Sequence, residues 1–498
     1  MRTLAELLRW RARRHPNLEA VRENGRSITY RELDASTTAL ANGLISLGVS
    51  PGDRVAILDK NSADYLELLW ALTKTGAVAA PVNWRLVQRE VHQVAGDAGA
   101  TMIIAGEEFR SAADGVGARV LGFDELPRID GDDPRRDVPG EVVWQLYTSG
   151  TTGLPKGAML THDNLFVCMP GITIEAPEMV QGGRCLVAMP LYHIGGCGWA
   201  AAAMYAGSTM VMVREIVPAQ LLQTLVEERV ESGFLVPAVL LFLTQVPGVE
   251  SADFSALKRM FYGASPITPE LLQRCIDLFG CKFTQVYGLT ETTGAITSLS
   301  HEEHHGDLLL SCGRANLGVD LRVVDADGND VASGEAGELI ARTPQNMRGY
   351  HGKPAETAEV MRDGWFHTGD AAAMDADGYV YIRDRIKDMI VSGGENVYPA
   401  EIEAVIAEHP AVADVAVIGV PDLRWGETVK AIIVRRPESA LEAAELIDFC
   451  RDRLAGYKRP TSVDFVDVIP RNPTGKVLKR QLREPYWQGQ ERRVRGSG

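Results

Sequence analysis

The segment at residues 147–157, YTSGTTGLPKG, constrains the fold of this chain more than any other. It holds four serine or threonine hydroxyls, three glycines and one lysine, directly after an apolar run. Glycines let backbone N–H groups approach a phosphate closely, hydroxyls donate hydrogen bonds to its oxygens, and a lysine supplies positive charge. The segment therefore predicts a phosphate-binding loop, with a flexible hairpin as the competing interpretation. It lacks the G-K-S/T ending of P-loop NTPases, so a different nucleotide-binding fold is expected.

The charge and the cysteines limit the partners and the compartment. Sixty-six acidic and 51 basic side chains give a formal charge of −15, which opposes binding to phosphodiester backbones, so we expect no nucleic-acid partner. The seven cysteines include no C-x-x-C pair, which indicates reduced thiols in a cytoplasmic protein. The most apolar stretch, residues 197–213, is shorter than the roughly 20 residues of a transmembrane helix, and we expect no such segment. Peripheral membrane contact stays open through Arg11, Arg13 and Arg14 of an amphipathic first helix.

The order of strand-like and helix-like segments predicts an α/β fold. Apolar strand patterns alternate with helical patterns from residue 43 to about residue 235, which is typical of large sheets covered by helices. After residue 325 the segments become short, β-rich and punctuated by turns. From residue 387 onward a second α/β alternation covers about 110 residues, within the usual size of a domain.

Five motifs follow one another along the chain: YTSGTTGLPKG at 147, YGLTE at 287, TGD at 368, RIKDMIVSGGENVYPAEIE at 385 and PTGKVLKR at 473. In this order they closely resemble the superfamily of adenylate-forming enzymes: acyl-CoA synthetases, peptide-synthetase adenylation domains and firefly-type luciferases. The resemblance spans almost the whole chain. It implies an ATP-dependent carboxylic acid:CoA ligase, which activates an acid as an acyl-adenylate and then passes the acyl group to coenzyme A.

The resemblance also implies a domain plan. We expect a large N-terminal domain over residues 1–384, built of two α/β sheets plus a β-rich subdomain, that binds the acid and ATP. A hinge over residues 385–388, centred on Lys387, would join it to a small mobile α+β domain over residues 389–498. Rotation about that hinge would exchange the adenylating pose for the thioester-forming pose.

The resemblance assigns an ATP site. Tyr287 is similar to the residue that stacks on adenine, and Asp370 to the carboxylate that accepts both ribose hydroxyls, with Arg385 contacting ribose or phosphate. A carboxylate suits two vicinal donors, and a guanidinium presents a fork of donors. Without the flanking motifs, Asp370 would be interpreted as a turn-capping carboxylate and Arg385 as a surface arginine. The loop residues expected to hold the phosphates are Thr148, Ser149, Gly150, Thr151, Thr152 and Lys156.

Three further residues are expected to act on the reacting centre. Thr290 is similar to a hydroxyl that contacts the adenylate phosphate. Glu291 is similar to the Mg²⁺ ligand, and one carboxylate together with a triphosphate is a usual way to bind this ion. Lys476 matches the lysine that reaches the carboxylate and the α-phosphate, where a cation offsets like charge between nucleophile and phosphoryl group. No general base is needed, because the acid is ionised at pH 7.

The second half-reaction needs a path for a thiol. Gly393 and Gly394 are expected to line the pantetheine tunnel of coenzyme A, because residues without side chains leave room for a thin arm. A simple Gly-Gly turn is the competing interpretation. His193 matches a histidine near the acyl pocket with a steric or orienting role, against the alternative of a satisfied core residue.

The acyl pocket is expected to be apolar. Segments 234–237, 262–266 and 286–288 hold no arginine or lysine, which favours a medium- or long-chain fatty acid over a dicarboxylic acid. An aryl or alicyclic acid stays an alternative. The residues assigned to this pocket are His193, Phe234, Gly263, Ala264, Val286 and Gly288.

The segment at residues 301–305, HEEHH, matches the H-E-x-x-H pattern of zinc proteases. Gly306 follows at once and serines precede it, so no stable helix is expected to present both histidines on one face. We interpret it as a polar surface loop.

Other functions share these motifs. An acyl-AMP ligase would load a carrier protein in place of coenzyme A, although the chain has no fused carrier domain and no insertion after Arg385. A luciferase-like monooxygenase would use O₂ after adenylation, and a nucleotide-sensing relative would lack catalysis. The oligomeric state, monomer or homodimer, is not determined by the sequence.

Overall fold

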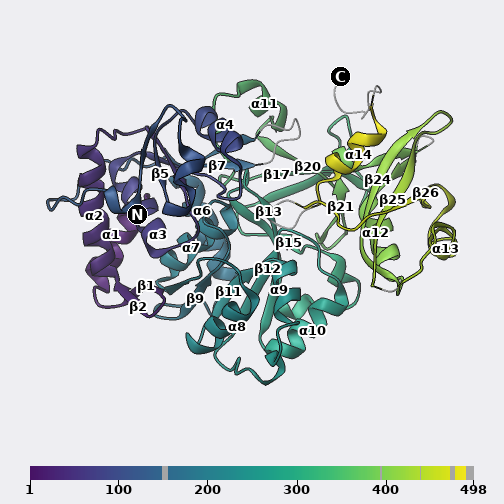
Figure 1. Cartoon of the computed structure of the whole chain (residues 1–498), viewed down its shortest axis with the longest axis horizontal. Helices are drawn as coiled ribbons and strands as arrows, with labels where there is room; N and C mark the ends of the chain where they lie inside the picture. The colour runs from purple at the N-terminus through teal and green to yellow at the C-terminus, as the bar shows by residue number, and fades with distance from the viewer. Residues whose placement is uncertain (149–154, 393–394, 438, 472–476, 489–498) are drawn as a thin grey trace. The chain divides into compact units, whose positions relative to one another are not determined.

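The computed structural model describes residues 1–148, 155–392, 395–437, 439–471 and 477–488. The chain divides into two compact units, one of Met1–Asp320 with Ala341–Phe366 and one of Leu321–Ile340 with His367–Gly498. Each unit combines sheets and helices, as Figure 1 shows, so the predicted mixed α/β class is confirmed.

A nine-stranded sheet forms one half of the first unit, in the order β15-β14-β13-β12-β11-β9-β10-β1-β2. The strands from β13 to β1 are parallel, and antiparallel strands close both edges. In sheet order they are Arg314–Ala315, Gly294–Leu299, Lys282–Leu289, Arg259–Gly263, Ser232–Leu235, Arg184–Val187, Thr209–Met212, Glu19–Glu23 and Arg26–Thr29.

A seven-stranded sheet forms the other half, in the order β18-β8-β7-β4-β3-β5-β6. Strands β7, β4, β3, β5 and β6 are parallel, whereas β8 runs antiparallel to both β7 and β18. In sheet order they are Gly349–Tyr350, Lys156–Thr161, Val142–Thr148, Val78–Pro81, Arg54–Leu58, Ala100–Ala105 and Arg119–Leu121.

Helices cover these sheets, and two of them lie in the core. Helix α3 is buried over nearly its whole length, and α7 is rich in glycine and alanine and is buried from Gly196 to Met204. Helix α7 and strand β10 account for the apolar stretch at 197–213. The helices of the first unit are α1 Leu4–Arg14, α2 Tyr30–Ser46, α3 Ala63–Thr75, α4 Gln88–Ala98, α5 Arg110–Ala113, α6 His162–Glu175, α7 Ile194–Ala206, α8 Pro218–Glu227, α9 Pro237–Leu243, α10 Pro269–Phe279 and α11 Pro354–Val360.

The strands of the second unit belong to two five-stranded sheets, the first of which also includes β19 and the start of β20 from residues 341–366. The first has the order β16-β17-β20-β19, with β21 paired to β20, and the second has the order β23-β22-β25-β24, with β26 paired to β25. The short β-rich segments expected after residue 325 form most of the first of these sheets, and the α/β alternation expected from residue 387 forms the second with its helices. The expected domain bounds, 1–384, 385–388 and 389–498, stay a prediction. The elements are β16 Asp320–Val324, β17 Ala336–Arg342, β19 Met361–Arg362, β20 Trp365–Met374, β21 Val380–Arg385, β22 Ile390–Ser392, β23 Glu395–Val397, α12 Pro399–Ala407, β24 Val412–Asp422, β25 Gly426–Arg435, α13 Ala443–Phe449, β26 Ser462–Phe465 and α14 Lys479–Arg483.

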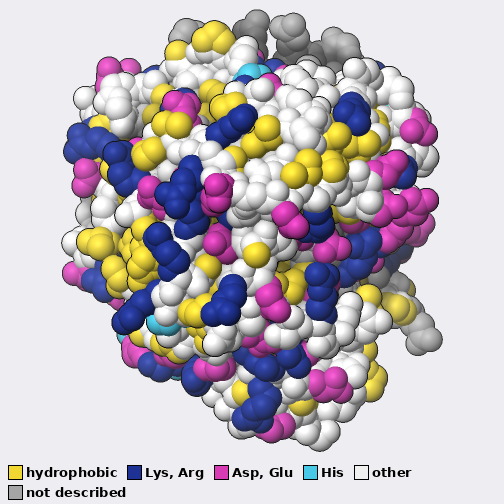
Figure 2. Space-filling model, turned by 90° about the vertical axis from the view of Figure 1, so that its left-hand side faces the viewer, with side chains coloured by type: hydrophobic (Ala, Val, Ile, Leu, Met, Phe, Trp, Pro, Cys, Tyr) yellow, Lys and Arg dark blue, Asp and Glu magenta, His cyan; other side chains and the backbone are white. Residues whose placement is uncertain are grey.

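The first helix corrects one expectation. Arg11 is buried, and its guanidinium donates hydrogen bonds to the carbonyls of Met204 and Tyr205, so it is not available to lipid headgroups. Arg13 and Arg14 remain exposed. Figure 2 shows positive and negative side chains interspersed on this face rather than gathered by sign. The amphipathic pattern failed here because it does not show that a long side chain can reach the carbonyls at the end of another helix.

Within the described residues, every helix is too short or too polar to cross a membrane. All seven cysteines are buried and none forms a disulfide, as the sequence predicted.

Lys74 is a buried cation at the end of α3. Its Nζ lies 2.6 Å from Asp34 Oδ1, 2.7 Å from Thr38 Oγ1 and 3.3 Å from Asp133 Oδ2, and its side chain has no exposed area. Because a buried charge is tolerated only when it is paired, these contacts fix α3 to α2 and to the segment before β7.

We expect Lys74→Met to lower the free energy of unfolding by about 3 kcal/mol, because two carboxylates lose their buried partner. The control Lys282→Met removes an exposed pair with Glu302 and should cost less than about 1 kcal/mol. Urea unfolding followed by circular dichroism measures both variants. Equal shifts of the two midpoints would show that the Lys74 network does not stabilise the fold.

Candidate functional site

The two ends of the predicted phosphate loop are placed opposite each other. Strands β7 and β8 pair so that Thr148 faces Lys156 and Tyr147 faces Gly157, and the loop joins these strands. Lys156 is buried, and its ammonium forms no ion pair with any carboxylate of the described residues. The loop residues Ser149, Gly150, Thr151 and Thr152 lie outside the described residues, so their predicted roles stay predictions.

Glu291 lies in the turn between β13 and β14, beside the base of that loop. Its Oε1 accepts hydrogen bonds from Thr148 Oγ1 at 3.3 Å and from Tyr350 Oη at 2.9 Å, and the residue is only 8% exposed. Lys156 Nζ lies 5.1 Å from the centre of the Tyr350 ring. Thr148, Lys156 and Glu291, which come from two different sheets, therefore meet at one place.

The turn itself is held by threonines. Thr292 Oγ1 accepts a hydrogen bond from Leu289 N and donates to Gly294 O, while Thr293 adopts a positive φ of 54°. Thr290 is half-buried, and its carbonyl accepts a hydrogen bond from Thr293 N at 2.9 Å. The three threonines of YGLTETTG thus shape the backbone on which Glu291 is presented.

A strap at residues 345–351 joins this turn to β8. Gln345 Nε2 donates to the carbonyls of Thr292 and Ala295, and Met347 N donates to the carbonyl of Glu291 at 2.7 Å. Arg348 N and His351 N donate to Met159 O and Gly157 O of β8. Asn164 of α6 holds the strap in turn, through the carbonyls of Pro344 and Asn346. The strap therefore fixes the distance between the Glu291 turn and strand β8, which begins at Lys156.

The residues assigned to the acyl pocket lie at the carboxyl ends of parallel strands. Phe234 is on β11, Gly263 ends β12, and Val286 and Gly288 are on β13, directly followed by the Glu291 turn. A ligand site at this edge is the usual arrangement of parallel sheets. Gly263 has to be glycine, because a Cβ there would lie 2.1 Å from the carbonyl oxygen of Val286. Ala264, also assigned to this pocket, is exposed and has a positive φ of 67°. Tyr287, which was assigned to adenine, is half-buried on β13.

Aromatic rings pack behind this edge. The Trp199 ring centre lies 6.0 Å from that of Phe234 and 5.1 Å from that of Phe261. A Cβ on Gly195 at the start of α7 would lie 3.0 Å from the Phe234 ring, so helix and ring are in close contact.

His193 caps α7 beside these residues, with its ring 4.4 Å from that of Tyr192. Its Nε2 is buried and has no hydrogen-bond partner in the part of the chain that the structure describes. Burial, together with a smaller contribution from the charge of nearby Arg85, lowers the pKa of His193 to about 4. The imidazole is therefore neutral at pH 7, with one ring nitrogen left to interact with a bound group.

The second unit contains Asp370, which was assigned to the ribose hydroxyls, and Arg385, which was assigned to ribose or phosphate. Asp370 and Arg385 are register partners on β20 and β21, and Arg385 Nε lies 2.7 Å from Asp370 Oδ1. The guanidinium also donates to the Thr368 carbonyl at 3.2 Å. This pairing holds the carboxylate of the TGD motif in one orientation.

The predicted hinge residue Lys387 is exposed in a 3₁₀ turn at Ile386–Asp388. Asp388 lies 2.8 Å from Arg483 of α14. Burial favours the neutral form of Asp388, but the charges of Arg483, Lys387 and Lys479 outweigh it and lower its pKa.

Lys476, Gly393 and Gly394 lie outside the described residues, but the base of the segment that carries Lys476 is described. Arg471 and Val477 form an antiparallel bridge across it, and α14 follows. Lys479 Nζ at the start of α14 lies 2.8 Å from Glu403 of α12.

The HEEHH segment forms a 3₁₀ turn at His301–Glu303 and not an α-helix. His304 Nε2 contacts Tyr262 Oη at 2.9 Å, while His301 Nδ1 accepts from Phe283 N. Neither contact involves a metal-binding arrangement, and the described residues contain no group of three acidic, histidine or cysteine side chains placed to hold a metal.

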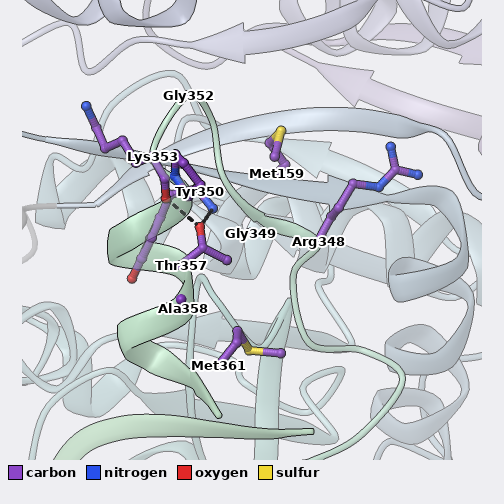
Figure 3. Close-up of a pocket in the computed structure, with 10 residues that line it drawn as sticks. Met159, Arg348, Gly349, Tyr350, Gly352, Lys353, Thr357, Ala358 and Met361 are labelled. Carbon is purple, nitrogen blue, oxygen red and sulfur yellow. Dashed lines mark hydrogen bonds between the residues drawn. The ribbon is translucent and has the colours of Figure 1, made fainter. Parts of the chain in front are cut away.

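A pocket of about 400 Å³ opens beside the strap, between β8, β18 and α11 (Figure 3). Two cations border it, but Lys353 pairs with Asp97 at 2.6 Å and Arg348 lies 3.5 Å from Glu141. Because both charges are already paired, this pocket offers no free cation to an anionic ligand.

Sequence reasoning missed three residues of this region. Tyr350 and Gln345 lie some 55 positions after the Glu291 turn and belong to none of the five motifs. Arg85 donates to Tyr192 Oη at 2.8 Å and stacks on Trp84, so a cation does lie near His193 although the pocket segments hold none. The only available signal was the Asn-Trp-Arg turn at residues 83–85, which follows the buried strand β4.

Residues 8–351 match the model of the AMP-binding enzyme family, and residues 401–476 match that of the AMP-binding enzyme C-terminal domain. The chain belongs to the AMP-binding enzyme family. It is therefore an adenylate-forming enzyme of the acyl- and aryl-CoA ligase type.

Three known proteins illustrate the range of this AMP-binding enzyme family. The chain is 39% identical to a fatty acid–acyl-carrier-protein ligase from Streptomyces coeruleorubidus, over 99% of this chain and 98% of that protein. It is 40% identical to a feruloyl-CoA synthase from Amycolatopsis, over 96% and 97%. The solved o-succinylbenzoate coenzyme A synthetase from Bacillus subtilis, in complex with ATP and a magnesium ion, is 29% identical, with a TM-score of 0.87 over 96% and 98% of the two chains.

The neutral His193 predicts an acid-sensitive fold. Its pKa is near 6.5 in the unfolded chain and about 4 in the folded one, so unfolding takes up a proton below pH 6.5 and stability falls from there towards pH 4. Lowering the pH from 7.5 to 5 should reduce the free energy of unfolding of the wild type by about 2 kcal/mol more than that of His193→Leu. Urea unfolding at both pH values measures this difference. Identical losses in the two proteins would show that His193 is not held neutral.

Proposed function

We propose that this enzyme is an ATP-dependent carboxylic acid:CoA ligase that forms AMP and pyrophosphate, with a medium- or long-chain fatty acid as its substrate. The observation that carries the proposal is the meeting of Thr148, Lys156 and Glu291 at the carboxyl end of β13, next to an apolar strand edge. A phosphate site and an apolar acid site side by side are what an acyl-adenylate requires.

ATP would lie along these elements. The loop at 148–156 would bind the phosphates, with Thr148 donating a hydroxyl and Lys156 a positive charge. Tyr287 would stack on adenine, and Asp370 would accept the ribose hydroxyls while Arg385 orients it. Thr290 would contact the α-phosphate.

Glu291 fits a Mg²⁺ ligand. It is a buried carboxylate whose two hydrogen bonds, in the described part of the chain, both go to Oε1 and leave Oε2 able to bind a hard cation. Bound Mg²⁺ would neutralise charge on the phosphates of ATP. An oxygen donor of this kind is what that ion prefers, with water completing its shell.

The first half-reaction is an in-line substitution at phosphorus. A carboxylate oxygen of the acid forms a bond to the α-phosphorus, and the bond from this phosphorus to the bridging oxygen of pyrophosphate breaks. Lys476 would offset the negative charge that gathers between the two anions. Pre-orientation by Thr148, Lys156 and Thr290 removes entropic cost from this step.

In the second half-reaction, the sulfur of coenzyme A forms a bond to the acyl carbon, the bond from that carbon to the phosphate oxygen breaks so that AMP leaves, and the thiol proton passes to solvent. We propose that residues 389–498 rotate about the hinge at 385–388 between the two steps, while residues 1–384 keep hold of the adenylate. Gly393 and Gly394 would then line the thiol's path. The neutral imidazole of His193 would orient the acyl group beside that path.

The identity of the acid substrate is the most specific part of the proposal. The aromatic packing of Trp199, Phe234 and Phe261 suits an apolar chain, and it also suits an aryl ring, as the feruloyl-CoA relative suggests. The carrier-protein relative supports a second acceptor, because a carrier's phosphopantetheine ends in the same thiol as coenzyme A.

The test combines both questions in one panel. Fatty acids of increasing length and aryl acids are incubated with ATP and Mg²⁺, with coenzyme A, with a phosphopantetheinylated carrier protein, or with neither. Pyrophosphate release and thioester mass are recorded. Acid-dependent pyrophosphate with acyl-CoA supports the proposal, thioester on the carrier alone makes the enzyme an acyl-AMP ligase, and pyrophosphate without thioester favours a luciferase-like reaction.

We expect Lys476→Ala to slow adenylation by about a hundredfold or more, because the charge at the reacting centre is lost. Thioester formation from a supplied acyl-adenylate should stay nearly unchanged, since phosphorus is no longer attacked. Arg480→Ala, an exposed change four residues on, is the control and should affect neither step. Equal loss of both half-reactions in Lys476→Ala would contradict the role of this lysine.

A further inference from the structure

Tyr350 lies at the centre of the contacts around Glu291, and no motif singled it out. Its hydroxyl donates to Glu291 Oε1 at 2.9 Å in a buried position. Lys156 Nζ lies over its aromatic ring, 5.1 Å from the ring centre. One side chain thus contacts both the carboxylate expected to bind Mg²⁺ and the ammonium expected to bind phosphate.

The backbone of Tyr350 is fixed from two sides. It pairs with Ala158 of β8, two residues after Lys156, while Tyr350 N donates to Thr357 Oγ1 at 2.9 Å. Figure 3 shows that Thr357 in turn donates to the Lys353 carbonyl, which closes the start of α11 under the tyrosine. Gly349 before it has a φ of 143° and lies so close to Thr357 that a Cβ would come within 2.8 Å of Thr357 Cγ2. The side chain therefore has little freedom to move away from the site.

The hydrogen bonds around Glu291 have a directional consequence. The hydroxyls of Thr148 and Tyr350 both donate to Oε1, so they set the rotation of the carboxylate about its terminal bond. A terminal carboxylate torsion is otherwise broad, and an unfixed carboxylate pays entropy each time it binds a cation. The ring acts on Lys156 differently, because a cation over an aromatic face is attracted by the ring quadrupole.

We propose that Tyr350 is a positioning residue for the Mg²⁺·ATP site. Its hydroxyl fixes the rotation of Glu291, whose Oε2 would bind the metal, and its ring holds the ammonium of Lys156, which would bind phosphate. This inference rests on the proposed function, since it assumes that Glu291 binds the metal that accompanies ATP. The two parts of the side chain thus have separable roles, one for the metal and one for the lysine.

Two substitutions separate these roles. Tyr350→Phe keeps the ring and removes the hydroxyl, whereas Tyr350→Leu removes both. Tyr381→Phe is the matched control, because it deletes a similar tyrosine–carboxylate hydrogen bond, to Asp375 at 3.1 Å, in the second unit. Binding of ATP is measured by titration calorimetry without any acid, once with Mg²⁺ and once with a chelator.

Tyr350→Phe should weaken binding of ATP about tenfold in the presence of Mg²⁺ and leave binding in chelator unchanged. Tyr350→Leu should weaken both, because Lys156 loses its support. Tyr381→Phe should match the wild type. Unchanged binding in Tyr350→Phe, or an equal loss with and without Mg²⁺, would overturn the inference.

A double substitution guards against a merely structural effect. In a Glu291→Gln background the hydroxyl has no metal ligand to orient, so adding Tyr350→Phe should change the Mg²⁺-dependent affinity no further. Additive losses would show that the tyrosine acts through the fold and not through Glu291. If the wild type binds no ATP in either condition, the proposed function fails. If the wild type binds ATP and Tyr350→Phe binds it equally well, only the inference about Tyr350 fails.

Discussion

The site depends on the hydrogen bonds of the strap at residues 345–351. Thr148 and Lys156 belong to one sheet and Glu291 to another, and neither sheet alone would keep them within contact. Gln345 and Met347 hold the Glu291 turn, and Arg348 and His351 hold β8. Most of these bonds join backbone groups or buried amides, which rarely go without partners in a folded protein, so the strap is both obligatory and rigid.

Rigidity here suits chemistry between anions. The whole chain carries a charge of −15, so ATP and a carboxylate gather only where local positive charge and backbone donors outweigh that field. Lys156 is buried over the Tyr350 ring, and Glu291 is buried between two hydroxyls. Preorganised groups of this kind need no reorganisation when charge develops, which is the usual source of electrostatic catalysis.

The sequence carried the local parts of this picture well. The apolar alternation predicted the mixed α/β class, the turn-rich stretch after residue 325 predicted the β-rich sheet, and two of the motifs pointed to Thr148, Lys156 and Glu291, which the structure brings together. These features could be predicted because they depend on residues that are close together in the sequence, such as the glycines and hydroxyls of one loop.

Long-range contacts could not be read in the same way. Tyr350 meets Glu291 across 59 positions, and Arg11 reaches the carbonyls of α7 across more than 190, so no periodicity or spacing reveals either. The absence of arginine and lysine from the three pocket segments also did not show the charge near the pocket. Arg85, which follows a different strand, lies close enough to lower the pKa of His193. The contacts around Glu291 and His193 were therefore found from the fold, whereas the residues proposed to touch the ligand were found from the motifs.

The most direct test of this account is exchange of labelled pyrophosphate into ATP, with Mg²⁺ and a fatty or aryl acid but no thiol. The account predicts exchange that requires the acid, because the adenylate forms reversibly in the site built by Thr148, Lys156 and Glu291. Exchange that is absent for every acid, or that proceeds equally without one, would contradict it.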